Sequence, residues 1–224
     1  MIKECENCWY YNKCIVKNGM KSVCMDYEHT LKSFLNSNIP HLLWSRKSIT
    51  GDENDRNFQA LKQLAIDIKN LYENKRNIYL YSNEFNSNLN DWLIKILQNY
   101  IFAFRAYQFN NKYENCVYYI DAGRFKEIVQ AQVDNKELFY NTVQCMQGCE
   151  LLGIDNIDKL KGHSSSQEKL VNILEYRNFK RHKSNIFTSH ISPSLLKKNG
   201  EAFTWNPYLV NNLLNEGDNG SYEV

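Results

Sequence analysis

Cysteine is the residue type with the clearest chemical pattern in this chain of 224 residues. Four of its seven cysteines fall near the start, at Cys5, Cys8, Cys14 and Cys24. Four thiolates complete the tetrahedral coordination that zinc prefers, and metal binding orders a segment too short to build its own core. The pattern therefore predicts a zinc knuckle. Because the spacing after Cys8 is looser than in zinc ribbons, an iron–sulfur cluster is the alternative.

A second group with chemical potential is a run of basic residues, namely Arg177, Lys180, Arg181 and Lys183. Lysine and arginine neutralise phosphates, so the run is a candidate DNA-binding patch. The alternative is a solvated helix end, where cations interact favourably with the negative end of the helix dipole. The net charge of +2 gives no general attraction to polyanions, so any DNA contact must come from a local patch.

The composition limits the class of protein. With 43% hydrophobic residues in 224, the chain can build one good-sized core with a small appendage. No apolar run reaches the roughly 20 residues needed to cross a bilayer. The first residues, MIKECENC, lack the charged-then-apolar pattern of a signal peptide. We therefore expect a soluble, cytoplasmic protein without membrane association.

Helical and strand patterns alternate along the chain. Apolar residues recur at helical spacing from Phe58 to Leu71 and predict an amphipathic helix over 55–74. Further helices are expected over 26–38, 90–107, 124–133, 138–146, 166–182 and 206–215, strands over 78–81, 116–120, 151–155 and 185–188, and a polar tail from Glu216. Strands that alternate with helices indicate an α/β fold with a parallel sheet covered on both faces.

The order of these features resembles the DnaC-like AAA+ replicative helicase loaders of bacteria and phages. The resemblance covers nearly the whole chain and rests on the cysteine-rich start and on the segments SNIP (37–40), IYLY (78–81), LLGIDNID (151–158), EYR (175–177) and IFTSHISP (186–193). It implies a P-loop NTPase fold of the AAA+ type. The domains would be a zinc-binding knuckle over 1–30, a linker over 31–54 and a degenerate AAA+-like ATPase domain over 55–224.

The phosphate-binding loop of that family has changed in this chain. The family pattern has two glycines, a lysine that reaches the phosphates, and a serine or threonine that binds magnesium. Here Ser82 and Ser87 replace the glycines, Asn88 replaces the lysine and Leu89 replaces the magnesium ligand. Loss of the lysine removes the main charge that stabilises the transferred phosphoryl group. We therefore expect ATP not to bind tightly in the usual pose.

The second half of the nucleotide site matches the family better. Asp155 ends its strand in the place of the magnesium-ligand carboxylate, and Asn156 takes the place of the second acid. An amide cannot serve as a general base for water. His190 stands where a polar residue would orient water, although a histidine with purely structural contacts is the alternative. Together with Ser82 and Asn88, these residues form a predicted remnant of a nucleotide site that has no catalytic residue.

The resemblance and the lost motif residues predict a pseudo-ATPase, not an enzyme, in DNA replication. The family implies binding to the replicative helicase or a loader ATPase and to single-stranded DNA, with oligomerisation left open. Residues 194–224 also lack an arginine that could act on a neighbour's nucleotide. The alternatives are a phage or mobile-element antagonist that blocks a host complex such as the loader, a stand-alone zinc-bearing DNA-binding protein, and a working ATPase with an unusual pocket.

Overall fold

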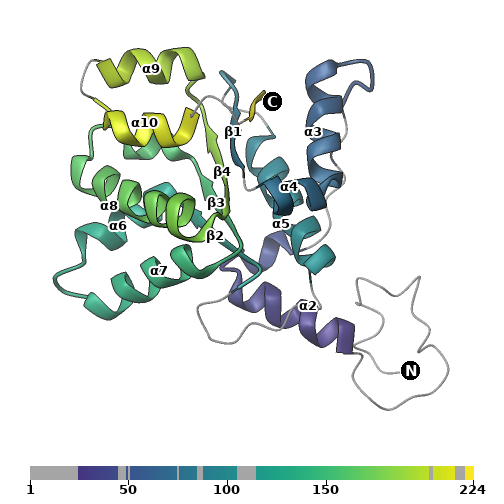
Figure 1. Cartoon of the computed structure of the whole chain (residues 1–224), viewed down its shortest axis with the longest axis horizontal. Helices are drawn as coiled ribbons and strands as arrows, with labels where there is room; N and C mark the ends of the chain where they lie inside the picture. Colours follow the sequence, from purple (N-terminus) through teal and green to yellow (C-terminus); the bar gives the residue numbers. More distant parts are fainter. Residues whose placement is uncertain are drawn as a thin grey trace.

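The computed structural model describes residues 25–44, 49, 51–74, 76–84, 88–104, 115–201, 204–214 and 220–224. A five-stranded sheet forms its centre (Figure 1). The strands are β1 (Asn77–Tyr81), β2 (Val117–Asp121), β3 (Leu151–Asp155), β4 (Ser184–Ser189) and β5 (Gly220–Glu223). Their order is β2-β3-β4-β1-β5, and every neighbouring pair is parallel. The predicted parallel α/β fold is therefore confirmed.

Helices cover both faces of the sheet (Figure 1). One face carries α2 (Met25–Asn36), α3 (Arg56–Ile66), α4 (Ile68–Asn74) and α5 (Leu89–Phe104). The other carries α6 (Ala122–Gln130), α7 (Lys136–Gly148), α8 (Ser164–Glu175), α9 (Pro193–Glu201) and α10 (Pro207–Leu214). Successive side chains of β1 alternate between the two cores, with Ile78 and Leu80 on the first face and Tyr79 on the second.

Three short helical turns complete the described part of the chain. They are η3 (His41–Leu43), η4 (Ile157–Leu160) and the π-helical turn η5 (Tyr176–Arg181). None of the helices in the ranges described above is long and apolar enough to cross a membrane.

The structure corrects several predicted elements. The helix expected over 55–74 is broken at Asp67, whose side chain accepts a hydrogen bond from the backbone N–H of Asn70, so that α4 starts anew. The helix expected over 166–182 ends at Glu175, where η5 begins. The polar tail from Glu216 is wrong for 220–223, which pair with β1 as β5. Helix α9 was not predicted.

The SNIP segment at 37–40 covers the outer edge of β2. The backbone N–H of Tyr119 donates to the carbonyl of Ser37 at 2.7 Å, and the Asn38 side chain donates to the Tyr119 carbonyl at 2.8 Å. Phe34, which precedes the segment, and Ile39, which lies within it, are buried in the core next to α5. This stretch lies within the range predicted as a linker, and it packs on the sheet. Where the domain boundary falls stays a prediction.

Gly153 allows α5 to lie close to the centre of the sheet. A Cβ atom added at Gly153 would come within 2.8 Å of Leu97 and 3.1 Å of Leu93, both on α5. Real Cβ atoms do not approach that closely, so a side chain here would push the helix away. The close approach matters for the site described below, because α5 also carries Asn90.

Arg177 is the largest charged side chain in the core and is fully buried. Its guanidinium donates to the carbonyls of Met146 and Cys149 at the end of α7 and to the carbonyl of Glu150 before β3. On β4 it donates to the Ser184 carbonyl and to the Asn185 side chain. The five N–H donors of an arginine are thus all used. The cation also lies at the carboxyl end of α7, where the helix dipole favours it.

We expect Arg177→Ala to lower the free energy of unfolding by about 3–5 kcal/mol, because the carbonyls of α7 and β4 would stay buried without a donor. Urea denaturation followed by circular dichroism measures this. Arg124→Ala is the matched control, since Arg124 is exposed and pairs only with Glu127 on its own helix, and it should change stability by no more than about 0.5 kcal/mol. Equal effects of the two variants would contradict a central role for Arg177.

Candidate functional site

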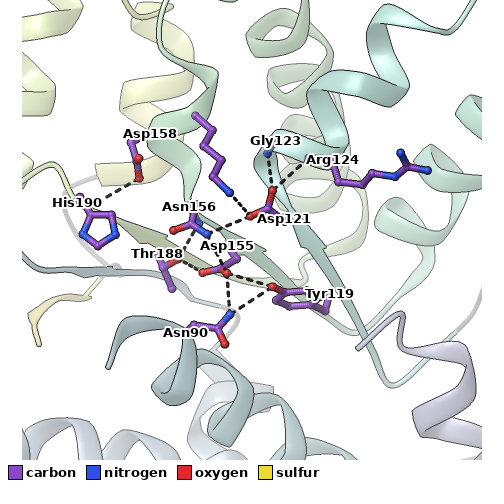
Figure 2. Close-up of polar contacts among 11 residues, drawn as sticks. Asn90, Tyr119, Asp121, Gly123, Arg124, Asp155, Asn156, Asp158, Thr188 and His190 are labelled. Atoms are coloured by element: carbon purple, nitrogen blue, oxygen red, sulfur yellow. Dashed lines mark hydrogen bonds and ion pairs between the residues drawn. The ribbon is translucent and has the colours of Figure 1, made fainter. Parts of the chain in front are cut away.

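The sheet order brings polar residues together at the carboxyl ends of the strands. In a parallel sheet these ends lie on one side, where α/β proteins bind their ligands. Asp121 ends β2, Asp155 ends β3, and Thr188 lies near the end of β4. Because β3 lies between β2 and β4, Asp155 is at the centre of this group (Figure 2).

The carboxylate of Asp155 is buried and accepts hydrogen bonds from four side chains. The Thr188 hydroxyl donates to Oδ1. Oδ2 accepts from Asn90 at 2.7 Å, from Asn156 at 3.1 Å and from the hydroxyl of Tyr119 at 3.1 Å. An ionised carboxylate offers about four lone-pair sites. The protein itself therefore satisfies Asp155, and this group of residues is called the Asp155 network below.

Asn156 joins two carboxylates. It adopts the left-handed backbone conformation, with φ 54° and ψ 52°, which asparagine tolerates better than most residues. Its side-chain amide donates to Asp155 and, at 3.0 Å, to Asp121, while its backbone N–H donates to Thr188 at 2.8 Å. A second acid at this position would repel both neighbouring carboxylates. The asparagine instead acts as a donor between them.

Asp121 also has partners on two sides. Its Oδ2 accepts from Lys159 at 2.8 Å, and its Oδ1 caps the start of α6 by accepting from the backbone N–H groups of Gly123 and Arg124. Partial burial acts to raise the pKa of Asp121, but the hydrogen bonds from Lys159 and Asn156 outweigh it, so that the pKa is below its usual value. Ionised Asp121 is thus the favoured form in the folded state.

Tyr119 is a donor whose proton is held firmly. Burial, together with the negative charge of Asp155, raises the pKa of the Tyr119 hydroxyl well above its usual value. The hydroxyl therefore stays protonated and donates to Asp155. Asn90 lies within hydrogen-bonding distance of both groups, at 3.3 Å from the Tyr119 oxygen.

The predicted phosphate loop lies between β1 and α5, and residues 85–87 are outside the described part of the structure. Ser82 is buried and accepts from the backbone N–H of Glu84. Asn88 is exposed and precedes the buried Leu89, the first residue of α5. The first turn of α5 carries Asp91. An acid there places negative charge at the helix end where a P-loop protein would hold phosphate.

His190 follows β4, and its backbone N–H donates to Asp158 at 3.2 Å (Figure 2). It is thus placed next to η4, while Ser82, Asn88, Asp155 and Asn156 lie around the strand ends and the start of α5.

The structure adds Asn90, Tyr119, Asp121, Lys159 and Thr188 to the site residues predicted from sequence. The sequence contained a signal that could have identified Asp121 as a site residue, because β2 ends in the same Ile-Asp pair as β3. Asn90 and Tyr119 had none, since only the packing of α5 brings them together.

The basic run divides into two parts. Arg177 is buried and Lys183 donates to the Gly148 carbonyl and pairs with Glu150 at 3.1 Å. The predicted DNA contact of Arg177 is wrong, because its side chain is buried and its donors are used in the core. The Lys183 ammonium is bound at the end of α7, and its DNA contact stays a prediction. Lys180 and Arg181 are exposed. They lie before the start of β4, at the end of the strand opposite Asp155.

The four cysteines at 5, 8, 14 and 24 are outside the described residues. Within the described ranges, no group of three or more His, Cys, Asp or Glu side chains is arranged to hold a metal ion. Zinc, or an iron–sulfur cluster, at the four cysteines stays a prediction.

No protein-family model matches the sequence, and no curated protein matches it. Solved structures do. The replication initiator DnaA bound to AMPPCP and single-stranded DNA aligns with a TM-score of 0.56 at 19% identity, over 79% of this chain and 48% of the DnaA chain. Domain III of the DnaA protein of Thermotoga maritima aligns with a TM-score of 0.57 at 16% identity, over 79% of this chain and 65% of that one. DnaI aligns with a TM-score of 0.58 at 15% identity, over 83% and 94%.

The fold is that of the AAA+ P-loop NTPases. This confirms the fold expected from the sequence. At these identities the likeness concerns the fold alone, and this chain spans about half the length of the first DnaA chain that it matches.

We expect Asp155→Ala to lower the free energy of unfolding by about 2–4 kcal/mol without any nucleotide present, because four donors would lose their acceptor and two of them, Tyr119 and Thr188, are buried. Chemical denaturation of the purified variant measures this. Asp134→Ala, at an exposed acid between α6 and α7, is the control and should stay within about 0.5 kcal/mol of the wild type. A neutral Asp155→Ala would mean that the network does not stabilise the fold.

The lowered pKa of Asp121 predicts a pH-dependent contribution to stability. Ionised Asp121 stabilises the folded state above the unfolded-state pKa of about 3.9, and this contribution is lost as the pH falls through the folded-state pKa. We expect Asp121→Asn to be less stable than the wild type near neutral pH, with the difference shrinking in acid. Urea denaturation at a series of pH values measures it. A difference that is the same at every pH would rule out a role for the charge.

Proposed function

We propose that this chain is a catalytically inactive, helicase-loader-like protein that acts in DNA replication by binding partners and not by hydrolysing ATP. The observation that carries the proposal is the Asp155 network. The carboxylate at the place of the magnesium ligand is fully engaged by Asn90, Tyr119, Asn156 and Thr188.

A magnesium ion would have to displace these donors. Mg²⁺ requires oxygen ligands at about 2.0–2.1 Å in near-octahedral geometry. Oδ2 of Asp155 already has three donors within 3.1 Å. Displacing the buried Tyr119 hydroxyl would leave it without its acceptor, at a cost of about 1–3 kcal/mol. The network thus holds the strand ends and α5 together by hydrogen bonds of the protein itself.

The residues at the positions that would act on ATP also support an inactive site. Asn88 stands in place of the phosphate-binding lysine, and Asp91 adds negative charge to the first turn of α5. Asn156 is bound as a donor to two carboxylates, which leaves no base for activating water. These features support an inactive nucleotide site.

The AAA+ fold, and the replication proteins whose solved structures share it, support a role in replication. One structural neighbour is a replication initiator bound to single-stranded DNA, and another is DnaI. By resemblance to helicase loaders, the partners of this chain are the replicative helicase or a loader ATPase, and single-stranded DNA. Cys5, Cys8, Cys14 and Cys24 would bind zinc and form an additional docking element.

The proposal predicts that millimolar Mg-ATP neither is hydrolysed nor raises the melting temperature. A ligand present at 100 times its Kd stabilises a protein by about 2.7 kcal/mol, which a thermal melt detects easily. An active loader ATPase, measured in parallel, provides the control. ATP turnover that is abolished by Asp155→Ala would overturn the proposal and favour a working ATPase with an unusual pocket.

The partner is tested by affinity capture with the purified replicative helicase, followed by a helicase-loading assay. Capture with stimulation of loading is the expected result. Capture with inhibition would identify an antagonist of loading instead. Failure to capture either the helicase or a loader ATPase would overturn the proposed role and favour a stand-alone DNA-binding protein.

A further inference from the structure

The π-helical turn η5 presents an aromatic side chain and two basic side chains to solvent. Phe179 is 74% exposed; among the large hydrophobic side chains of the described residues, Val133 has the same exposed fraction and only Leu42 is more exposed. Lys180 and Arg181 follow directly and are exposed too. We call Tyr176, Phe179, Lys180 and Arg181 the η5 surface.

Anchoring of the turn explains why Phe179 faces outward. Arg177 is held in the core by its hydrogen bonds to α7, to Glu150 before β3, and to β4. Two residues further along a helical turn, a side chain points to nearly the opposite side. The inward position of Arg177 therefore sets the outward position of Phe179.

Neighbouring contacts hold the turn in place. The Asn178 side chain donates to the Asn212 side chain on α10 at 3.1 Å and accepts from Asn185 on β4 at 3.0 Å. The backbone N–H of Lys183 donates to the carbonyl of Arg177. The η5 surface is thus presented by a turn that is fixed to both α10 and β4.

The two cations are gathered around one ring. The Lys180 ammonium lies 5.9 Å and the Arg181 guanidinium carbon 5.8 Å from the centre of the Tyr176 ring. Arg181 also donates to the Tyr176 hydroxyl at 3.1 Å. Such cation–π contacts restrain two long, flexible side chains next to the exposed Phe179.

We propose that the η5 surface binds single-stranded nucleic acid, with Phe179 stacking on an unpaired base and Lys180 and Arg181 contacting the phosphates beside it. Proteins bind single strands by this combination of aromatic faces and basic side chains, because every base has a π face and every linkage has a charge. Base-paired nucleic acid hides those faces. The inference rests on the proposed function, to which it adds the place of nucleic-acid contact.

The position of the η5 surface separates it from the Asp155 network. From Ser184, at the start of β4, to Thr188 is four residues, or roughly 13 Å at about 3.3 Å per residue. Nucleic acid on the η5 surface therefore does not compete with the residues at the carboxyl ends of the strands.

Binding of a fluorescein-labelled oligothymidylate of about 20 nucleotides, which exceeds known site sizes, tests the inference by fluorescence anisotropy. We expect Phe179→Ala to raise the Kd at least about fivefold, with an unchanged salt dependence. The double variant Lys180→Ala/Arg181→Ala should reduce the slope of log K against log salt by about 1.4. Circular dichroism melts check that each variant is folded.

Matched controls remove the same groups elsewhere on the surface. Tyr140→Ala deletes another exposed aromatic residue, and Lys136→Ala/Lys161→Ala deletes two exposed lysines. Weakened binding of the η5 variants alone supports the inference. Wild-type Kd values in the η5 variants would overturn it and leave the proposed function intact.

Two further outcomes also decide the matter. If the wild-type protein does not bind the oligonucleotide, the η5 surface is not a nucleic-acid site, and helicase capture alone then judges the proposed function. If Phe179→Ala abolishes helicase capture but leaves oligonucleotide binding unchanged, the surface is a protein contact and the inference is wrong.

Discussion

The carboxylate of Asp155 is the point on which the arrangement of the strand ends depends. It accepts from a residue of α5, a residue of β2, a residue of β4 and the residue that follows β3. No other single group in the described site joins so many elements. Two of its donors, Tyr119 and Thr188, are buried and would be left without an acceptor if they moved away, so the geometry is maintained by the protein alone.

The two ends of the sheet differ in how their polar side chains are used. At the carboxyl ends, acids and amides bind one another and form a closed set of hydrogen bonds. At the amino end of β4, Arg177 satisfies the core from within while its neighbours face solvent. Under the proposed function, the first end can be rigid while the second offers a surface to a partner.

Much of the fold could be predicted because its signals are local. The buried strand at Leu151–Asp155 and the amphipathic pattern of α5 are readable from a few consecutive residues. Strand β5 was missed because an edge strand with exposed Ser221 and Glu223 carries little apolar pattern. The π-helical turn was missed because it changes the helical phase without any change in composition.

The site was predictable in part for the same reason. Asp155 ends a recognisable strand and Asn156 follows it directly, so their positions followed from the sequence. The partners of Asp155 on α5 and β2 are 65 and 36 residues away along the chain, and only tertiary packing identifies them. The basic run was predicted less well. Its charge did not reveal that the Arg177 side chain is buried in the core.

The covered edge of β2 bears on how copies of this chain can associate. The SNIP segment occupies the outer N–H and carbonyl of Tyr119, so another strand cannot pair there. In the described sheet β5 is the other outer strand. If two molecules joined through β5, the covered edge of β2 would prevent further strands from pairing at the far side of each sheet. Such pairing ends at a dimer, whereas a sheet with two open edges would continue into a fibre.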